Sequence, residues 1–240
     1  MKVDLIVVGA IINEDQEHFI KEAIASVEDK YEWNNKFLIL DGIQPDSGYG
    51  EQFLNYRSDV EYNNPSFNFR VMDKCIYFKE ILMTTLGRSD ADYVVVIQDD
   101  VLAPQNIDLD EDLEFMRDNS DCKIISYPHK IIPEEGTHWF VPIETKGKYI
   151  KTHGWSERVF LAKRKDFYHN IRCERGRGKK AEKFCEYVYH NTLKRLQSKG
   201  ELPSEEYWKA WGIYIKNDNI HSHLVAHRPK GHSHTTDFKK

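Results

Sequence analysis

Two adjacent carboxylates, Asp99 and Asp100, stand at the end of the apolar run 93–97, with Gln98 between the run and the acids. Like charges at the tip of a buried strand are costly unless a cation or strong hydrogen-bond donors neutralise them. Mg²⁺ and Mn²⁺ accept carboxylate and phosphate oxygens as ligands. The pair therefore indicates a metal and phosphate site, and the plainer alternative is that both acids cap a loop or the helical turn that follows.

The elements that must position these acids begin near the N-terminus. Residues 3–12 form a near-continuous apolar run rich in Val and Ile, typical of a strand buried on both faces of a parallel sheet. Asn13 is a good N-cap, and apolar residues then recur at helical spacing. A second apolar run at 37–40 ends at Asp41, before a turn rich in Gly, Pro, Asp and Ser. This order of strand, helix and strand requires a parallel pairing.

The rest of the chain carries weaker signals. The stretch 49–68 has no clear period and is expected to be a loop with one short helix. Residues 75–86 predict an amphipathic helix that ends at Gly87, a common C-cap residue. The other predicted elements are the strand that precedes the acid pair, short strands at 123–127 and 158–162, a long helix at 179–198, and a strand and loop in the tail at 221–240.

Composition bounds the class of protein. The chain has 240 residues, 40% of them hydrophobic and 30% charged, with a net charge of -5, which excludes overall disorder. No apolar run approaches the ~20 residues that cross a bilayer, and no signal peptide is indicated, so we expect a cytoplasmic protein. The four cysteines are far apart and lack CxxC spacing, which argues against a zinc ribbon or a disulfide framework.

Charge is distributed unevenly along the chain. Acids predominate from 99 to 121, and bases predominate from 163 to 199. The basic segment favours an anionic partner, and a solvated helical face explains it equally well.

Three stretches together resemble a known family. "VDLIVVGAIINEDQEHFIKEAIASV" is similar to the opening strand and helix of GT-A-fold glycosyltransferases of the family 2 kind, "FLILDGIQPDSG" to their second strand, and "FKEILMTTLGRSDADYVVVIQDDVLAP" to the segment that carries their DXD motif. The resemblance covers about residues 3–104. It implies an α/β fold of the GT-A, Rossmann-like kind, in which helices flank a mostly parallel central sheet and a C-terminal extension follows.

The same resemblance implies how the chain is divided. A single catalytic domain would span 1–240. Its nucleotide-sugar-binding half would be 1–104 and its acceptor-side half 105–200, and an extension at 201–240 would close over the donor site.

The resemblance also implies a donor and a metal. The donor is a nucleoside diphosphate sugar, with a UDP-sugar favoured, and the cofactor is Mn²⁺ or Mg²⁺. Gln98 replaces the first acid of a typical Asp-x-Asp, so Asp100 is expected to bind the metal directly, and Asp99 the ribose or a metal-bound water. The other expected donor contacts are Ala10, Asn13, Glu14, Asp41, Lys79, Trp155 and Lys230.

The tail carries five of the eleven histidines. Lys230, His232 and His234 are expected to fold over the phosphates, and His227 or His232 to complete the metal shell. The alternative is a polar, solvent-exposed tail, and the alternation of histidines also fits one face of a strand.

A catalytic base is expected if the enzyme inverts the sugar configuration, as the resemblance implies, because a carboxylate must then take the acceptor's proton. The Glu-Asp pair usual in the family is absent. In order of preference, the candidates are Glu157, Glu186 and Glu182. Trp155, close to Glu157, could stack on a sugar ring; alternatively, Trp155 lies in the core and Glu157 pairs with Arg158 or Arg164.

Two other functions stay open. A nucleotidyltransferase uses a similar sheet, but it is expected to carry a Gly-rich, basic phosphate loop after the first strand, where this chain has "GAIINEDQEH". A non-catalytic module that binds metal through its histidines and nucleic acid through its basic helix is the third reading. The acceptor of a glycosyltransferase is open as well: an anionic molecule, a glycan or a nucleic acid would each fit the sequence.

Overall fold

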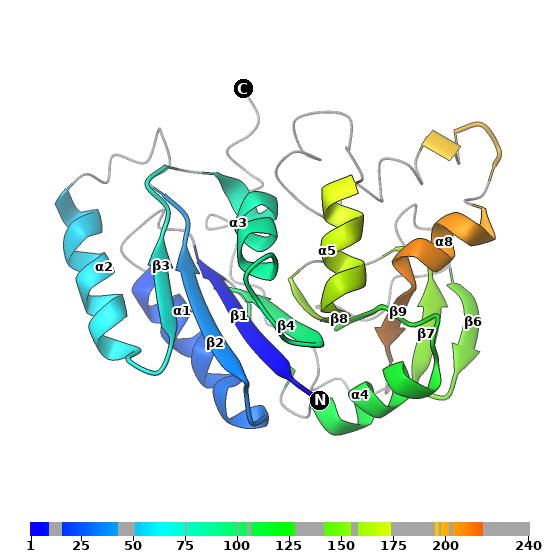
Figure 1. The fold of residues 1–240 in the computed structure, drawn as a ribbon, viewed down its shortest axis with the longest axis horizontal. Coiled ribbons are helices and arrows are strands. Elements are labelled where there is room, and N and C mark those ends of the chain that lie inside the picture. Colours follow the sequence, from blue (N-terminus) through cyan, green and yellow to red (C-terminus); the bar gives the residue numbers. More distant parts are fainter. Residues whose placement is uncertain are drawn as a thin grey trace.

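The computed structural model describes eleven stretches of the chain: residues 1–9, 16–42, 51–74, 76–99, 101–104, 107–127, 142–154, 158–173, 195–196, 198–201 and 204–217. These stretches contain a nine-stranded sheet in the order β3-β2-β1-β4-β8-β5-β9-β7-β6 (Figure 1). The strands are β1 Val3–Gly9, β2 Asn35–Leu40, β3 Asn68–Val71, β4 Tyr93–Gln98, β5 Ile124–Ser126, β6 Pro142–Lys146, β7 Tyr149–Thr152, β8 Val159–Lys163 and β9 Ile213–Lys216. The helices are α1 Gln16–Ala25, η1 Glu28–Lys30 (a 3-10 turn), α2 Glu51–Asn63, α3 Tyr77–Leu86, α4 Leu109–Asp118, α5 Arg164–Cys173 and α8 Glu205–Trp211.

The first half of the sheet is parallel, as the sequence predicts. β1 pairs with β2 on one side and with β4 on the other, and β3 pairs with β2, all in parallel. The chain therefore runs outward from β1 to β3 and then returns to the other side of β1. Such a reversal of strand order is the switch point at which open α/β sheets bind ligands, beyond the carboxyl ends of the strands.

The second half of the sheet mixes directions. β8 lies antiparallel between β4 and β5, β9 is parallel to β5, and the hairpin of β6 and β7 closes the far edge. β5 and β8 confirm the two short strands predicted at 123–127 and 158–162. The whole is an α/β fold in which helices flank a sheet with a parallel core, as predicted.

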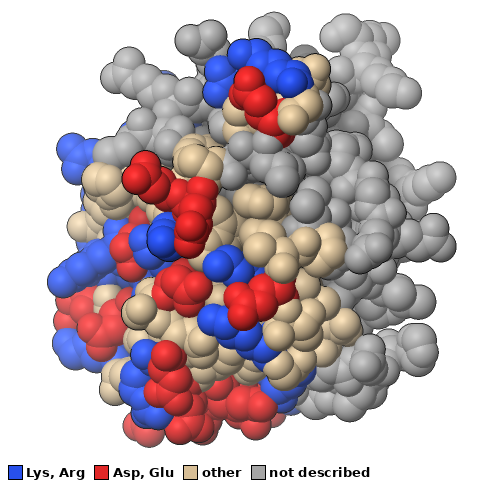
Figure 2. Space-filling view, turned by 90° about the vertical axis from the view of Figure 1, so that its right-hand side faces the viewer, with Lys and Arg blue, Asp and Glu red and all other residues tan. Residues whose placement is uncertain are grey.

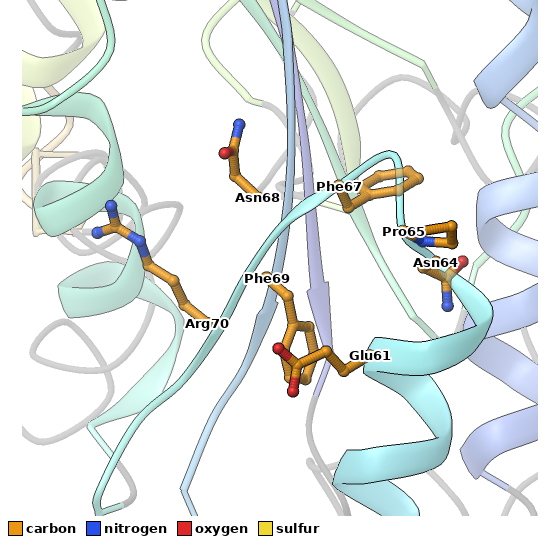
Figure 3. Close-up of a pocket in the computed structure, with 7 residues that line it drawn as sticks. All are labelled: Glu61, Asn64, Pro65, Phe67, Asn68, Phe69 and Arg70. Atoms are coloured by element: carbon orange, nitrogen blue, oxygen red, sulfur yellow. The ribbon is translucent and has the colours of Figure 1, made fainter.

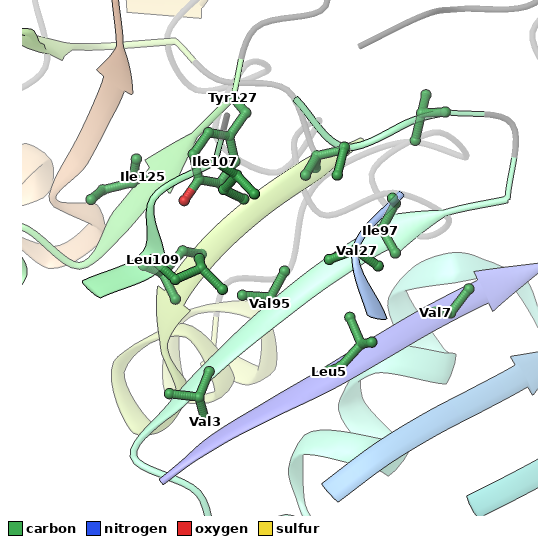
Figure 4. Packing of buried hydrophobic residues seen from close by; sticks show 14 of the residues in the cluster. Val3, Leu5, Val7, Val27, Val95, Ile97, Ile107, Leu109, Ile125 and Tyr127 are labelled. Carbon is green, nitrogen blue, oxygen red and sulfur yellow. The ribbon is translucent and has the colours of Figure 1, made fainter. Parts of the chain in front are cut away.

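The core lies on both faces of the sheet because alternate residues of each buried strand point to opposite sides. Leu5 and Val7 of β1 belong to the cluster that α1 and α4 cover, and Ile6 and Val8 belong to the cluster beneath α3 and α5. Figure 4 shows the first cluster, where Val3, Leu5 and Val7 of β1 lie beside Val95 and Ile97 of β4. Burial on both faces explains why the sequence of β1 is a near-continuous apolar run.

The prediction for 49–68 was wrong in its main point. The stretch holds α2, a helix of 13 residues, and residue 68 opens the edge strand β3. Val60 is the one fully buried hydrophobic residue among the described side chains of α2, while Leu54 and Tyr62 are exposed. A helix with so narrow an apolar stripe has little hydrophobic periodicity in its sequence, so the pattern did not predict it.

Other elements lie outside the predictions or outside the described part of the chain. α4, α5, α8, β6, β7 and β9 were not predicted. The helix predicted at 179–198 falls within the described residues only at 195–196 and 198, and the tail strand does not fall within them at all. No helix in the described ranges is long and apolar enough to cross a membrane.

Candidate functional site

Two acids flank the end of β1 at the switch point. The backbone N–H of Asp41, just after β2, donates to the carbonyl of Gly9 at 2.8 Å. The backbone N–H of Asp99, just after β4, donates to the carbonyl of Val8 at 2.9 Å. Both residues are buried, with exposures of 4% and 3%. The structure thus brings Asp41 and Asp99 to one edge of the sheet, as the strand order predicted.

The Asp41 carboxylate caps α3. Its Oδ1 accepts hydrogen bonds from the backbone N–H groups of Gly42 at 2.9 Å and Ile76 at 2.8 Å, and its Oδ2 accepts one from that of Tyr77 at 3.1 Å. The first N–H groups of a helix have no partner within the helix and carry a partial positive charge, so a carboxylate there is favourable. Asp41 therefore anchors the start of α3 to the end of β2.

The junction between β2 and α3 is tightly built. A Cβ on Gly42 would lie 2.2 Å from the carbonyl carbon of Lys74, so only glycine fits beside this segment. Tyr77 has a φ of 65°, a left-handed conformation that a bulky residue rarely adopts. Lys79 follows in the first turns of α3 and is buried. Backbone strain of this kind persists where the surroundings hold it, and here Asp41 accepts the N–H of the strained residue.

The other side of the site joins β4 to β8. The N–H of Gln98 donates to the carbonyl of Arg158 at 3.0 Å, and Ile97 is paired with Val159 in the antiparallel ladder. Arg158 therefore lies directly opposite Gln98, one residue from Asp99. Sequence reasoning named Arg158 only as a partner for Glu157; its position became visible through the pairing of strands.

The outcome for the predicted site residues is uneven. Asp41 and Asp99 lie at the end of β1, and Lys79 lies on the helix that Asp41 caps. The predicted residues that fall outside the described part of the chain are Ala10, Asn13, Glu14, Asp100, Trp155, Glu157, Glu182, Glu186, His227, Lys230 and His232. Their roles stay predictions.

The predicted metal would find one of its expected ligands within the described part of the chain. Asp99 supplies carboxylate oxygens, the kind of donor that suits Mg²⁺ or Mn²⁺. No group of three or more His, Cys, Asp or Glu side chains that could hold a metal occurs within the described ranges. The carboxylate of Asp99 is thus a donor that suits a hard cation, and the metal role of Asp100 stays a prediction.

His153 stands just before the segment that carries Trp155 and Glu157. It follows Thr152, whose carbonyl accepts the indole N–H of Trp208 at 2.9 Å. Burial, and to a smaller extent the positive charge of Lys151, lowers the pKa of His153 to about 4. His153 is therefore neutral at pH 7 and supplies no positive charge to an anionic ligand.

A buried polar cluster that the sequence did not reveal lies in the second half of the sheet. Asp112 of α4 accepts hydrogen bonds from the hydroxyls of Tyr127 and Tyr149, both at 2.6 Å, and the Lys216 ammonium lies 2.8 Å from its Oδ1. Burial raises the pKa of Asp112, and the Lys216 charge opposes that rise. The cluster ties α4 to β7, β9 and the end of β5. Asp112 stands in the segment 99–121, where acids predominate, and no signal in the sequence distinguished it from its acidic neighbours.

Two surface features do not belong to this site. A cavity of about 530 Å³ lies beside the edge strand β3, lined by Glu61, Asn64, Pro65, Phe67, Asn68, Phe69 and Arg70 (Figure 3). It lies toward the amino end of β3, away from the strand ends that carry Asp41 and Asp99. Figure 2 shows acidic and basic side chains interspersed on one face of the described chain. In the second half of the fold, Lys148 pairs with Glu111, and Lys151 pairs with Asp121. Neither feature brings together buried acids at strand ends, as the end of β1 does.

Comparisons with known proteins identify the fold. No protein-family model matches the chain, and no curated protein matches it. Among solved structures, S. aureus TarS 1-349 in complex with UDP has a TM-score of 0.54 and 11% identity, and the match covers 92% of this chain and 59% of that chain. The same TarS fragment in a second structure has a TM-score of 0.53 and 14% identity, with the same coverage. This chain therefore spans about three fifths of the TarS fragment.

A cytidylyltransferase from Leptospira borgpetersenii is similar as well. Its TM-score is 0.52 and its identity 11%, and the match covers 95% of this chain and 82% of that chain. At such identities the likenesses concern the fold alone. They confirm the GT-A-like α/β fold that the resemblance in the sequence implied.

Proposed function

We propose that the chain is a glycosyltransferase that moves a sugar from a nucleoside diphosphate sugar, with a UDP-sugar favoured, to an acceptor hydroxyl with inversion. The observation that supports this most is the placement of Asp41 and Asp99 on either side of Gly9, at the switch point of a GT-A-like sheet. In sheets of this kind a nucleotide lies across the strand ends. Two of the acids that the sequence marked for the donor, Asp41 and Asp99, follow the strands on either side of β1, which supports the proposal.

The residues would divide the work as follows. Asp41 holds the start of α3, which together with Lys79 forms the nucleoside side of the site. Asp99 and Asp100 would hold Mn²⁺ or Mg²⁺, which when bound stabilises the negative charge on the leaving diphosphate. The segment 1–104 would bind the donor and 105–200 the acceptor. The extension 201–240 would close over the donor through Lys230, His232 and His234, and His227 or His232 would complete the metal shell.

Glu157 is our first candidate for the base, ahead of Glu186 and Glu182. Its chain position supports this choice, because the next residue, Arg158, is hydrogen-bonded to Gln98 beside the acids. In the reaction the acceptor oxygen would bond to the anomeric carbon as the bond from that carbon to the diphosphate oxygen breaks. Glu157 would take the acceptor's proton, and Trp155 would stack on the sugar.

The proposal is tested by binding and by product analysis. Wild-type protein should bind UDP in the presence of Mn²⁺, and mass spectrometry should detect release of UDP from a UDP-sugar. The variant Asp99→Asn should bind UDP about tenfold or more weakly, since a lost charged contact costs about 1.5–3 kcal/mol. Asp110→Asn, which changes an exposed acid of α4, is the matched control. Equal affinities of wild type and Asp99→Asn for UDP would contradict the assignment of the site.

A nucleotidyltransferase is the second candidate, and one observation favours it. The match to the cytidylyltransferase covers 82% of that chain, a larger share than the 59% of the TarS fragment. Incubation with CTP or UTP and a sugar phosphate separates the two functions. Release of pyrophosphate with formation of a nucleotide sugar would establish the second candidate in place of the first.

A further inference from the structure

Arg158 occupies an unusual position for an arginine. Its side chain is half-buried at the site edge. Its carbonyl accepts the N–H of Gln98, but its guanidinium makes no hydrogen bond or ion pair with any residue in the described part of the chain. Arg117, by contrast, is ion-paired with Glu114 and Asp118, and Arg164 donates to the carbonyls of Ala91 and Leu86. The guanidinium of Arg158 is partly withdrawn from water, and no acid among the described residues pairs with it. It is therefore suited to bind an anionic ligand.

The pairing of β4 with β8 decides which face Arg158 occupies. Val96 is paired with Phe160, and both belong to the cluster beneath α3 and α5. Side chains alternate along a strand, so Gln98 and Arg158, two residues further toward this edge, share that face and face each other across the ladder. Asp41 is on the same face, since its carboxylate caps α3.

The distance across this edge suits an extended ligand. The order β2, β1, β4, β8 separates Asp41 from Arg158 by three strand spacings, which is about 14 Å. A nucleoside held at the capped start of α3 would direct its phosphates along the edge toward Arg158. Planar guanidinium groups bind phosphate oxygens through two parallel hydrogen bonds, which makes Arg158 suited to that end of the ligand.

The residue opposite Arg158 is the reason that its charge is available. An acid at position 98, as in a typical Asp-x-Asp, would pair with Arg158 across the strands and neutralise it. Gln98 cannot do so, because an amide carries no charge. The glutamine in place of the first acid of the motif thus leaves the positive charge of the half-buried Arg158 without a neutralising partner at position 98.

We propose that Arg158 binds the diphosphate of the donor directly and that Gln98 keeps its guanidinium free to do so. The inference rests on the proposed function, because it assigns a role within the donor site. It adds that part of the affinity for the diphosphate persists without a divalent cation. Arg158 also stabilises the leaving group, since the same phosphate oxygens gain negative charge as the bond between the sugar and the diphosphate breaks.

Calorimetric titration of UDP and of uridine into full-length protein tests this, in Mn²⁺ and separately in EDTA. In EDTA, wild type should bind UDP, and Arg158→Gln should bind it about tenfold or more weakly. Gln98→Glu should weaken it likewise, because the new carboxylate pairs with Arg158. Arg158→Lys should fall between, and Arg117→Gln, which removes the same charge from the exposed face of α4, should match wild type.

Affinity for uridine should be the same in all these variants, which separates loss of the phosphate contact from a folding defect. The role of Arg158 is overturned if Arg158→Gln and wild type bind UDP equally in EDTA, or if wild type binds UDP only with Mn²⁺. If wild type binds no nucleoside diphosphate under either condition, the proposed function itself fails, and the role of Arg158 fails with it.

Discussion

The carboxylate of Asp41 accepts a hydrogen bond from the backbone N–H of Tyr77 at 3.1 Å, although the two residues are 36 positions apart in sequence. This bond joins the end of β2 to the start of α3 and holds a tyrosine in a left-handed conformation. Asp41 is thus first a structural anchor of the site edge. Any contact between Asp41 and a nucleotide would depend on the position of α3, which Asp41 itself holds in place.

Replacement of Asp41 by alanine should lower the free energy of unfolding by about 1–3 kcal/mol, because the first N–H groups of α3 then lose their acceptor. Asp41→Asn keeps an acceptor oxygen and should cost less. Urea denaturation followed by circular dichroism measures both. Asp118→Ala, at an exposed acid paired with Arg117, is the control and should change stability by less than about 1 kcal/mol. A loss in Asp41→Ala no larger than in the control would contradict the anchoring role.

A methyl group at Gly42 should also damage this junction. In Gly42→Ala the new Cβ meets the Lys74 backbone at 2.2 Å, and we expect a loss of about 1–3 kcal/mol as the segment is pushed aside. Gly147→Ala is a demanding control, since Gly147 has a φ of 60° but open space around it, and should cost only about 1 kcal/mol. Thermal unfolding of the two variants compares them. Equal melting temperatures would show that the close approach to Lys74 does not matter.

The buried cluster around Asp112 predicts a large effect at Lys216. In Lys216→Met a buried carboxylate loses its ammonium partner, and breaking such a pair costs about 3–5 kcal/mol. The double variant Asp112→Asn with Lys216→Met should recover part of this loss. Lys209→Met, which removes the exposed partner of Glu205, should cost under about 1 kcal/mol. Denaturation in urea gives all three values, and a double variant less stable than Lys216→Met would refute the buried pair.

His153 predicts a defined dependence of stability on pH. Its pKa is about 4 in the folded chain and 6.5 in its ordinary state, so the unfolded chain binds more protons between these values. The folded state therefore loses stability as pH falls from about 6.5 to 4. In His153→Gln this fall should be smaller by about 1–3 kcal/mol. Unfolding at pH 7, 5.5 and 4 measures it, with exposed His169→Gln as control, and parallel curves for wild type and His153→Gln would exclude the effect.

Much of the parallel half of the fold could be read from the sequence. The runs that became β1, β2 and β4 are almost entirely apolar because both faces of these strands are buried, with Asp4 of β1 as an exception. α3 was recognisable from its apolar stripe and from Gly87 at its end. α2 and β3 were not, because α2 is largely polar and β3 is a four-residue edge strand with little burial.

The sequence by itself determined which acids would follow strands and, through the parallel order, that Asp41 and Asp99 would share one edge. Only the tertiary structure decided that the carboxylate of Asp41 caps α3, that Arg158 faces Gln98, and that Asp112 is buried beside Lys216. These are contacts between distant parts of the chain, set by strand order and register. Local periodicity carries no information about register between distant strands, so the charge of Arg158 at the site edge could be found only once β8 was seen beside β4.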